Sequence, residues 1–322
     1  MCLNNKTYLN IAFLMACMIK KTLEISTDGA YLSCKNKQLL IKREGVDQVS
    51  IPCEDINMVL LDAPNSLISY GALTQLLENN ASFLVCGKNH MPMGLLMPFS
   101  SHNQVFSRIQ NQIQCSKPTH KKLWKTLIQK KILAQGELLN KRSSEYTRMQ
   151  YLAKDVKSGD PQNNEAQAAR IYWKHWLPDE FNFHRDSDGD GINGLLNYGY
   201  AVYRATISRA CVMAGLLPAL GIHHHNRSNA FCLADDLIEP FRPMVDSRVR
   251  ALVLKSQAEL NPKTKKALLS LLHLEVNCNG VKGPFAVQIH QYVSSFVRSI
   301  QEGSDLLEVP SWNYLDTDSC GF

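Results

Sequence analysis

The chain has 322 residues, of which 45% are hydrophobic and 20% are charged, and its formal net charge at pH 7 is +6. This length allows a sizeable core and predicts about two domains, while the mild positive charge permits a nucleic-acid partner without requiring one. The ten cysteines include no C-x-x-C pair, which argues against a zinc knuckle and gives no disulfide framework. A reduced, cytoplasmic protein is therefore expected.

The chain begins with an apolar run, YLNIAFLMACM, at residues 8–18. The run resembles the core of a signal peptide, but Lys6 is its only charged flank and it is too short to span a bilayer. Met18, followed by IKKTLEIS, is typical of a second translation start. Residues 1–17 are therefore expected to be an upstream start or a disordered extension, and no membrane-spanning segment is expected elsewhere.

Residues 18–101 predict a small β-rich domain. Short runs with partial alternation are separated by turn signals such as Asp28-Gly29 and Glu44-Gly45, as expected for strands. The predicted strands are KTLEIS, AYLSCKN, QLLIKRE, QVSIP, INMVLLD, SFLVCG and MGLLMP, and a helix is predicted over residues 69–80.

From residue 102 the apolar residues recur at three-to-four spacing, which is typical of helices. Segments with this pattern begin at residues 103, 120, 143, 161, 192, 230 and 262. The predicted fold class is therefore α+β, with the β-rich domain at 18–101 followed by a larger all-helical domain at 102–322.

Basic residues are concentrated in the first part of this helical region. Nine Lys and Arg side chains lie between Lys117 and Arg148, opposed only by Glu137 and Glu145. Such a stretch is either a solvated helix face or a surface that follows a phosphate backbone with salt-dependent affinity. The residues alone leave both interpretations open.

The loop HRDSDGDGINGLLNYGY at residues 184–200 begins like a calcium-binding EF-hand, because a D-x-D-x-D-G pattern starts at Asp186. The twelfth position should be a bidentate Glu but is Asn197, and no second copy of the motif exists. We therefore favour a turn in which Asp188 or Asp190 caps a helix that begins near Ile192.

Glu165 is a carboxylate in an apolar setting. Asp160 is the predicted N-cap of its helix, and the neighbours of Glu165 on the same face include Ala168 and Tyr172. A carboxylate on such a face is either neutralised by a basic group or binds a metal. Taken alone, the residues favour a structural ion pair.

The segment GIHHHNRSNAFCLADDLIEPFRP combines histidines with acidic residues. Three consecutive histidines cannot all face one point. Asp236 and Glu239 are three apart, so both carboxylates share one helix face, and Pro240 should kink or end that helix. A histidine with two or three carboxylates suits Mg²⁺ or Mn²⁺ better than zinc and points to phosphodiester chemistry.

Several segments together resemble one known family. They are NNEAQAARIYW, GINGLLNYGYAVYRA, LLPALGIHHHNRSNAFCLADDLIEPFRPMVD and the opening MIKKTLEISTDGAYLSCKNKQLLI. They resemble the CRISPR-associated integrase–endonuclease of the spacer-acquisition (adaptation) complex, the first Cas protein family, and within it the type II branch. The likeness runs from Met18 to about Asp246.

The resemblance implies which residues form the site. The metal-binding and catalytic glutamate of the family falls on Glu165, its histidine on His224 after the anchoring Gly221, and its last acidic residue on Glu239. Asp236 matches another acidic position and is expected to be a supporting ligand. Asp235 is less favoured as a ligand, because it does not share a helix face with Glu239.

The resemblance also implies the activity. The expected enzyme is a metal-dependent DNA endonuclease and integrase, with Mg²⁺ or Mn²⁺, in prokaryotic antiviral immunity. The 3′-hydroxyl of a captured DNA fragment attacks a phosphodiester at the edge of a CRISPR repeat. The alternative is a catalytically idle DNA-binding scaffold.

The implied partners are double-stranded DNA, a second copy of the chain as a homodimer, and the small second-family Cas subunit, which bridges two dimers; no membrane partner is expected. The resemblance turns the basic stretch into a candidate DNA surface. The residues expected to contact DNA are Lys121, Lys122, Lys125, Lys130, Lys131, Arg204, Arg227 and Arg242, although Arg242 has an ion pair near the metal as its alternative role.

Overall fold

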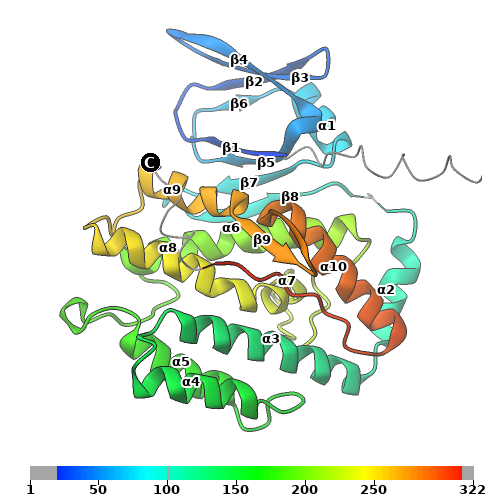
Figure 1. Cartoon of the computed structure of the whole chain (residues 1–322). Helices are drawn as coiled ribbons and strands as arrows, with labels where there is room; N and C mark the ends of the chain where they lie inside the picture. Colours follow the sequence, from blue (N-terminus) through cyan, green and yellow to red (C-terminus); the bar gives the residue numbers. More distant parts are fainter. Residues whose placement is uncertain (1–19, 100–101, 314–322) are drawn as a thin grey trace, which may run out of the picture.

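The computed structural model describes residues 20–99 and 102–313, in which a β-rich region sits on a larger helical region (Figure 1). The prediction for residues 1–17 lies outside the described residues. Among the described helices, none is long and apolar enough to cross a membrane.

The β-rich region contains two four-stranded sheets. The first sheet has the order β1-β5-β7-β8, in which only β8 runs antiparallel, and the second has the order β4-β3-β2-β6. The strands are β1 (Lys21–Ile25), β2 (Tyr31–Lys35), β3 (Gln38–Arg43), β4 (Val46–Pro52), β5 (Ile56–Leu61), β6 (Leu67–Ile68), β7 (Ser82–Cys86) and β8 (Pro92–Leu96). The seven predicted strands are all present, and the two-residue β6 is too short to leave a pattern in the sequence.

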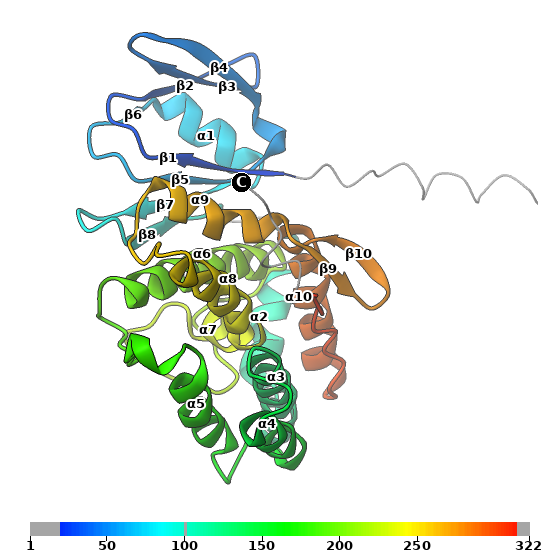
Figure 2. The same cartoon turned by 60° about the vertical axis from the view of Figure 1, so that its left-hand side comes forward.

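Helix α1 (Tyr70–Glu78) packs between the sheets, as the sequence predicts. The side chain of Ser69 caps its start by accepting a hydrogen bond from the Ala72 amide. Figure 2 shows α1 lying against the sheets from inside the β-rich region. Leu76 of α1 joins Ile56 and Phe83 in one buried cluster, which is the core of this region.

The central strand β5 is buried on both faces, which explains why its sequence INMVLL is apolar except for Asn57. Ile56 and Val59 point into the core around α1, whereas Met58 and Leu60 belong to the core of the helical region. Helix α6 lies directly beneath β7 and β8 on that second face (Figure 1). The first sheet is therefore shared between two hydrophobic cores.

The helical region contains nine α-helices in the described part of the chain. They are α2 (Val105–Gln114), α3 (Lys117–Glu137), α4 (Ser144–Asp155), α5 (Asn164–His175), α6 (Ile192–Met213), α7 (Cys232–Leu237), α8 (Arg242–Leu254), α9 (Pro262–Ser270) and α10 (Phe285–Glu302). The long helix α6 is buried over most of its length, and a Cβ added at Gly199 would lie 2.4 Å from Val245 Cγ1. Glycine at this position therefore allows α6 and α8 to cross in contact.

The α+β class is confirmed, with one addition to the helical region. Residues 275–284 form a hairpin of β9 (Glu275–Cys278) and β10 (Val281–Pro284) that packs against α10. Asn279 and Gly280 connect the strands with φ angles of 50° and 84°. An Asn-Gly pair is a strong hairpin signal because both residues accept positive φ, and the helical prediction missed it because the strands have only four residues each.

Two predicted helix caps are wrong. The N-cap of α5 is Asn163, at φ 54°, and not Asp160. The N-cap of α6 is Gly191, with no side-chain hydrogen bond, so neither Asp188 nor Asp190 caps that helix. In both cases a residue in an unusual backbone conformation starts the helix later than the aspartate.

Candidate active site

Glu165 and Glu239 converge on one lysine. Lys131, from the middle of α3, places its Nζ 2.6 Å from Glu165 Oε1 and 2.6 Å from Glu239 Oε2. The lysine side chain is 11% exposed and that of Glu239 is 6% exposed. Two carboxylates that are 74 positions apart in the sequence are thus brought to the same ammonium group.

The first turn of α5 is held by the loop before it. Both carboxylate oxygens of Asp160 accept backbone hydrogen bonds, one from the Asn164 amide and one from the Glu165 amide, each at 2.9 Å. Asp160 therefore supports the helix start from outside it, although Asn163 is the N-cap. These contacts fix the backbone from which the Glu165 side chain projects.

Glu239 owes its position to the helix break that Pro240 predicts. Helix α7 ends at Leu237, a single 3₁₀ turn covers Glu239–Phe241, and α8 begins at Arg242. Within this turn Arg242 Nε lies 2.8 Å from Glu239 Oε1. The guanidinium of Arg242 also stacks on the Tyr200 ring, 4.7 Å from its centroid, so Glu239 is held between two cations.

His224 is oriented by Asp236. Oδ2 of this buried aspartate accepts the backbone amides of Ile222 at 2.6 Å and His223 at 2.9 Å. Oδ1 lies 2.5 Å from His224 Nδ1 and accepts the His224 amide at 3.3 Å. Because a carboxylate accepts but does not donate, the proton of the neutral ring lies on Nδ1, and in that state Nε2 keeps a free lone pair.

Gly221 makes this loop possible. A Cβ at this position would lie 2.3 Å from the His224 carbonyl oxygen and 2.9 Å from Asp236 Oδ2. The loop therefore needs glycine for close packing and not for a positive φ.

Helix α3 supplies a second contact to the histidines. The Trp124 ring stacks on His223, with centroids 4.1 Å apart and an interplanar angle of 4°, and meets His224 edge-on at 5.6 Å. Trp124 and Lys131 are seven residues apart and so lie on the same helix face. One face of α3 thus contacts all three candidate ligands.

Opposing effects set the charges in the site. Burial opposes the charge of Glu239, but Arg242 and Lys131 outweigh it and lower the pKa of that carboxyl to about 2. Burial also opposes the Lys131 ammonium, yet Glu239 and Glu165 raise its pKa. The hydrogen bond to Asp236 raises the pKa of His224 against the effect of burial, and the charges of Glu239 and Glu165 raise it further.

The donor set suits a hard cation in kind. Two carboxylates and one imidazole are ligands that Mg²⁺ and Mn²⁺ accept. Glu239 Oε2 is buried and, although it lies 2.6 Å from Lys131 Nζ, it has no aligned hydrogen-bond donor. Within residues 20–99 and 102–313, however, no three His, Cys, Asp or Glu side chains are close enough to ligate one ion. The donors converge on Lys131 and do not form a ready cage.

The remaining acidic residues of the motif have other partners. Both oxygens of Asp236 already accept hydrogen bonds, so this residue fits the role of orienting His224 better than the expected role of supporting ligand. Asp235 pairs with Arg204 at 2.7 Å and accepts a hydrogen bond from Asn229.

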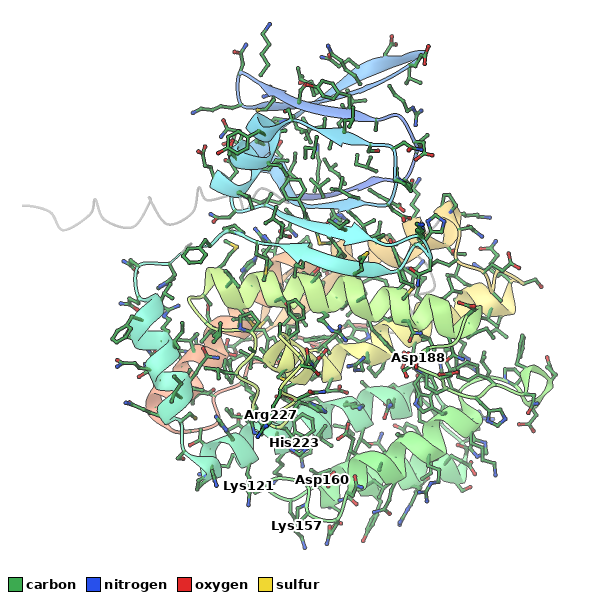
Figure 3. All side chains as sticks on the ribbon, turned by 180° about the vertical axis from the view of Figure 1, so that it is seen from behind. Lys121, Lys157, Asp160, Asp188, His223 and Arg227 are labelled. Carbon is green, nitrogen blue, oxygen red and sulfur yellow. The ribbon has the colours of Figure 1, made fainter. Side chains whose placement is uncertain are left out.

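The eight expected DNA contacts fall into three groups. Lys121, Lys122, Lys130 and Arg227 are exposed, and Figure 3 shows Lys121 and Arg227 on the same side of the molecule as His223. Lys125 is half-buried and Arg204 pairs with Asp235. Lys131 and Arg242 are instead paired with the glutamates, as the alternative for Arg242 predicts.

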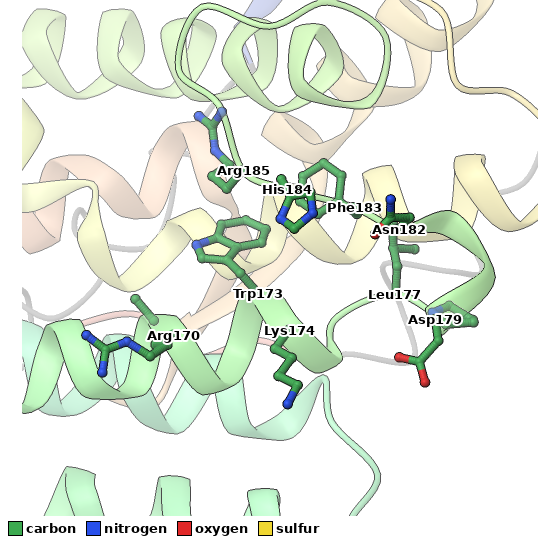
Figure 4. Close-up of a pocket in the computed structure, with 11 residues that line it drawn as sticks. Arg170, Trp173, Lys174, Leu177, Asp179, Asn182, Phe183, His184 and Arg185 are labelled. Carbon is green, nitrogen blue, oxygen red and sulfur yellow. The ribbon is translucent and has the colours of Figure 1, made fainter.

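A pocket of about 640 Å³ lies between α5 and the loop that precedes α6. Figure 4 shows Arg170, Trp173 and Lys174 on one side of it and Phe183 and Arg185 on the other. Arg170 follows Glu165 by five residues on α5, which corresponds to about 7 Å along the helix and about 140° around it. The pocket therefore lies on a different face of α5 from Glu165 and presents cations and aromatic rings beside the site and not within it.

The calcium-like loop is closed by its own side chains. Asn197 Nδ2 donates to the Ser187 carbonyl at 2.8 Å, and Arg185 donates to the Asn197 side-chain oxygen at 2.6 Å. At the twelfth position, where an EF-hand has two ligand oxygens, this loop has an amide that donates. Our preference for a structural turn over a calcium site agrees with these contacts.

A buried cluster behind Arg242 escaped the sequence interpretation. Tyr172 and Tyr200 both donate hydrogen bonds to Asp246, and Tyr200 in turn packs on Arg242. The only available signal was that these tyrosines recur at core positions of their helices. The pairing of Lys131 was also missed, because nine basic residues gave no reason to single out one.

Comparison with known proteins identifies the chain. The model of the family described as CRISPR associated protein Cas1 matches residues 23–272. A CRISPR-associated endonuclease Cas1 of Neisseria meningitidis serogroup C (strain 8013) is 33% identical over 279 residues, which cover 85% of this chain and 90% of the relative.

Two solved structures share the fold at low identity. A casposase bound to integration product has a TM-score of 0.74 and 20% identity, with 94% of each chain covered. A Cas6-RT-Cas1–Cas2 complex has a TM-score of 0.72 and 16% identity, with 90% of this chain and 36% of that chain covered. Because the family model spans most of the chain and the curated relative exceeds 30% identity, the chain belongs to the Cas1 family of CRISPR-associated proteins.

Proposed function

We propose that this protein is a metal-dependent DNA integrase that inserts short DNA fragments into a CRISPR array. The main supporting observation is that Glu165 and Glu239 converge on the Lys131 ammonium. Both carboxylates are close enough to His224 for their charges to raise its pKa. Glu165, Glu239 and the free Nε2 of His224 would hold Mg²⁺ or Mn²⁺. When bound, the cation would polarise the phosphoryl oxygen and favour ionisation of the attacking hydroxyl.

The reaction is a transesterification. The 3′-oxygen of the fragment forms a bond to phosphorus, the phosphodiester at the repeat edge breaks, and the repeat strand leaves with a free 3′-hydroxyl that takes up a proton. One phosphodiester is broken for each one formed, so the step needs no nucleotide triphosphate. The same site would hydrolyse DNA when water replaces the 3′-hydroxyl.

The residues of this chain supply position and charge. Asp236 keeps the His224 proton on Nδ1, so that Nε2 faces outward as a ligand. Arg242 neutralises one oxygen of Glu239 and fixes its carboxylate plane. Such preset orientation lowers the reorganisation that accompanies reaction.

The catalytic test is strand joining of a short oligonucleotide to a supercoiled, repeat-bearing plasmid in Mn²⁺ with the second Cas subunit present. Glu165→Gln, Glu239→Gln and His224→Ala should each abolish joining, while the matched control Glu275→Gln on the exposed hairpin should join normally. Normal joining by the site variants, or joining that persists in EDTA, would refute the proposal.

A DNA surface around the site is part of the proposal. The exposed Lys121 and Lys122 on α3 and the cations Arg170 and Lys174 of the α5 pocket would contact phosphates. Each phosphate contact contributes about 0.9 to the slope of log K against log salt. Lys121→Glu/Lys122→Glu should therefore weaken duplex binding and flatten this slope, and an unchanged slope would remove these residues from the surface.

We further propose a homodimer bridged in pairs by the small second Cas subunit, and membership of the type II branch. The Cas6-RT-Cas1–Cas2 complex, which contains a chain of this fold, supports such a partner. Light scattering of the chain alone and with that subunit tests both stoichiometries.

The alternative is an idle DNA-binding scaffold. It predicts salt-dependent DNA binding without joining in Mn²⁺ or Mg²⁺ even when the partner subunit is present. The convergence of both glutamates on Lys131 favours the enzyme, because a scaffold has no need of two carboxylates at one point, one of them buried.

A further inference from the structure

The residue at the centre of the site is a lysine that the family motif does not contain. Lys131 lies in α3, 34 positions before Glu165, and reaches both glutamates with one ammonium group. Its neighbours Ile128 and Ile132 are fully buried, so the helix at this point is anchored in the core. The side chain therefore has a fixed base and a charged end that lies between the two carboxylates.

The two contacts occupy the oxygens that a cation would use. Lys131 Nζ is 2.6 Å from Glu165 Oε1 and from Glu239 Oε2, while Arg242 takes the other oxygen of Glu239. Glu239 has no oxygen that is free of a cationic neighbour. An ion bound by both glutamates would have to lie within a few ångströms of the ammonium.

Charge balance argues against both cations being present together. The two glutamates are matched by Lys131 and Arg242, so the four groups sum to zero formal charge. Adding a divalent ion would leave an excess of two positive charges in a largely buried cluster, where like charges repel strongly. Withdrawal of one ammonium halves that excess.

We propose that Lys131 is a built-in competitor of the divalent cation: its ammonium and the ion use the same two carboxylate oxygens, so the ion binds only when the lysine side chain moves aside. This inference rests on the proposed metal site and adds a control on how that site fills. The lysine holds the glutamates together and raises the ion concentration needed for loading. The long, flexible stem of lysine permits the movement with α3 in place.

Calorimetric titration of Mn²⁺ into the full-length protein tests the competition without measuring catalysis. Lys131→Met removes the charge but keeps the length, and it should bind Mn²⁺ at least about tenfold more tightly than the unsubstituted protein. Lys131→Arg keeps the charge and should stay close to the unsubstituted affinity. Lys131→Gln, which is neutral and polar, repeats the test should the methionine variant fail to fold.

Thermal unfolding gives a second readout. Without added ion, Lys131→Met should melt below the unsubstituted protein, because two carboxylates then face each other unpaired. Mn²⁺ should raise its melting temperature more than that of the unsubstituted protein, since a tighter ligand stabilises more.

The outcomes separate the inference from the proposed function. Equal or weaker Mn²⁺ binding by both neutral variants overturns the competition while leaving the metal site standing. Absence of Mn²⁺ uptake by every protein, including the neutral variants, overturns the metal site and the inference with it. Tighter binding that Glu239→Gln then abolishes supports both.

Discussion

Substitution of Asp236 by asparagine should separate the orientation of His224 from the integrity of the fold. Asn has nearly the same shape as Asp, but one of its two terminal atoms donates instead of accepting. If the amide oxygen keeps the contacts with the Ile222 and His223 amides, the NH₂ group faces His224 Nδ1 and the His224 amide. Nδ1 must then accept, which moves the imidazole proton to Nε2.

The size of the effect follows from the contacts that change. One hydrogen bond between a charged group and the imidazole is lost, worth about 1.5–3 kcal/mol, and one buried amide is left unpaired at about 1–3 kcal/mol. We therefore expect the free energy of unfolding to fall by roughly 2.5–6 kcal/mol. Loss of a supporting partner of a metal-bound histidine lowers metal affinity or activity by about 10–100-fold, and the displaced proton should place Asp236→Asn at the upper end.

Two measurements on each protein check this prediction. Strand joining in Mn²⁺ gives the loss of activity, and urea denaturation gives the loss of stability. The control is Asp235→Asn, the same change one residue earlier, where the carboxylate pairs with Arg204 and Asn229 and makes no contact with His224. Joining by Asp236→Asn at the rate of the Asp235→Asn control would refute the assignment of Asp236 as the residue that orients His224.

Three further changes test other parts of the structure. Gly221→Ala places a Cβ 2.3 Å from the His224 carbonyl oxygen and should cost about 1–3 kcal/mol and displace His224; urea denaturation and Mn²⁺ titration measure both effects, and wild-type values would contradict the close packing. Burial raises the pKa of Asp246 from 3.8 to about 7, so the folded state binds its proton more tightly and stability is lost as pH rises between these values. In urea denaturation, the stability of Asp246→Asn relative to the wild type should therefore increase as the pH rises from 5 to about 7. A stability difference that does not change with pH would refute the raised pKa of Asp246. Lys265→Met leaves the buried Asp62 without its ammonium partner and should destabilise by about 3–5 kcal/mol, a loss that adding Asp62→Asn should largely restore.

The sequence could predict the break at Glu239 but not the partners that fill the site. Pro240 and the apolar residues around it correctly place Glu239 in a short turn between two helices. The choice of His224 among three adjacent histidines came from the family motif alone, because spacing cannot distinguish them. Asp236 illustrates the limit. The sequence predicts that it shares a helix face with Glu239, but it does not predict that the backbone amides of a distant loop donate hydrogen bonds to its carboxylate.

Contacts between distant segments account for what sequence reasoning could not reach. Lys131 pairs across 34 positions with Glu165, and no local pattern marks it among its basic neighbours. It lies seven positions from Trp124 and so shares that face of α3, but Lys117 has the same separation, so the spacing does not single out Lys131. The caps of α5 and α6 were mispredicted because a left-handed Asn163 and a glycine replace the aspartates that propensity favours.

The sheet that contains β5 also bears on how the molecule comes apart. Its two faces contribute to different cores, with Val59 on one side and Leu60 on the other. The same sheet is therefore a boundary of both cores. Arg209 of α6 adds a hydrogen bond to the Asn80 carbonyl at 2.7 Å, and Lys265 of α9 adds its ion pair with Asp62. Unfolding of either region would expose the apolar side chains on one face of this sheet to water. The two regions should therefore unfold together in a single cooperative transition. A substitution that unfolds the β-rich region would therefore also unfold the helices that hold Glu165 and Glu239. The two regions would not separate as folded units joined by a flexible hinge.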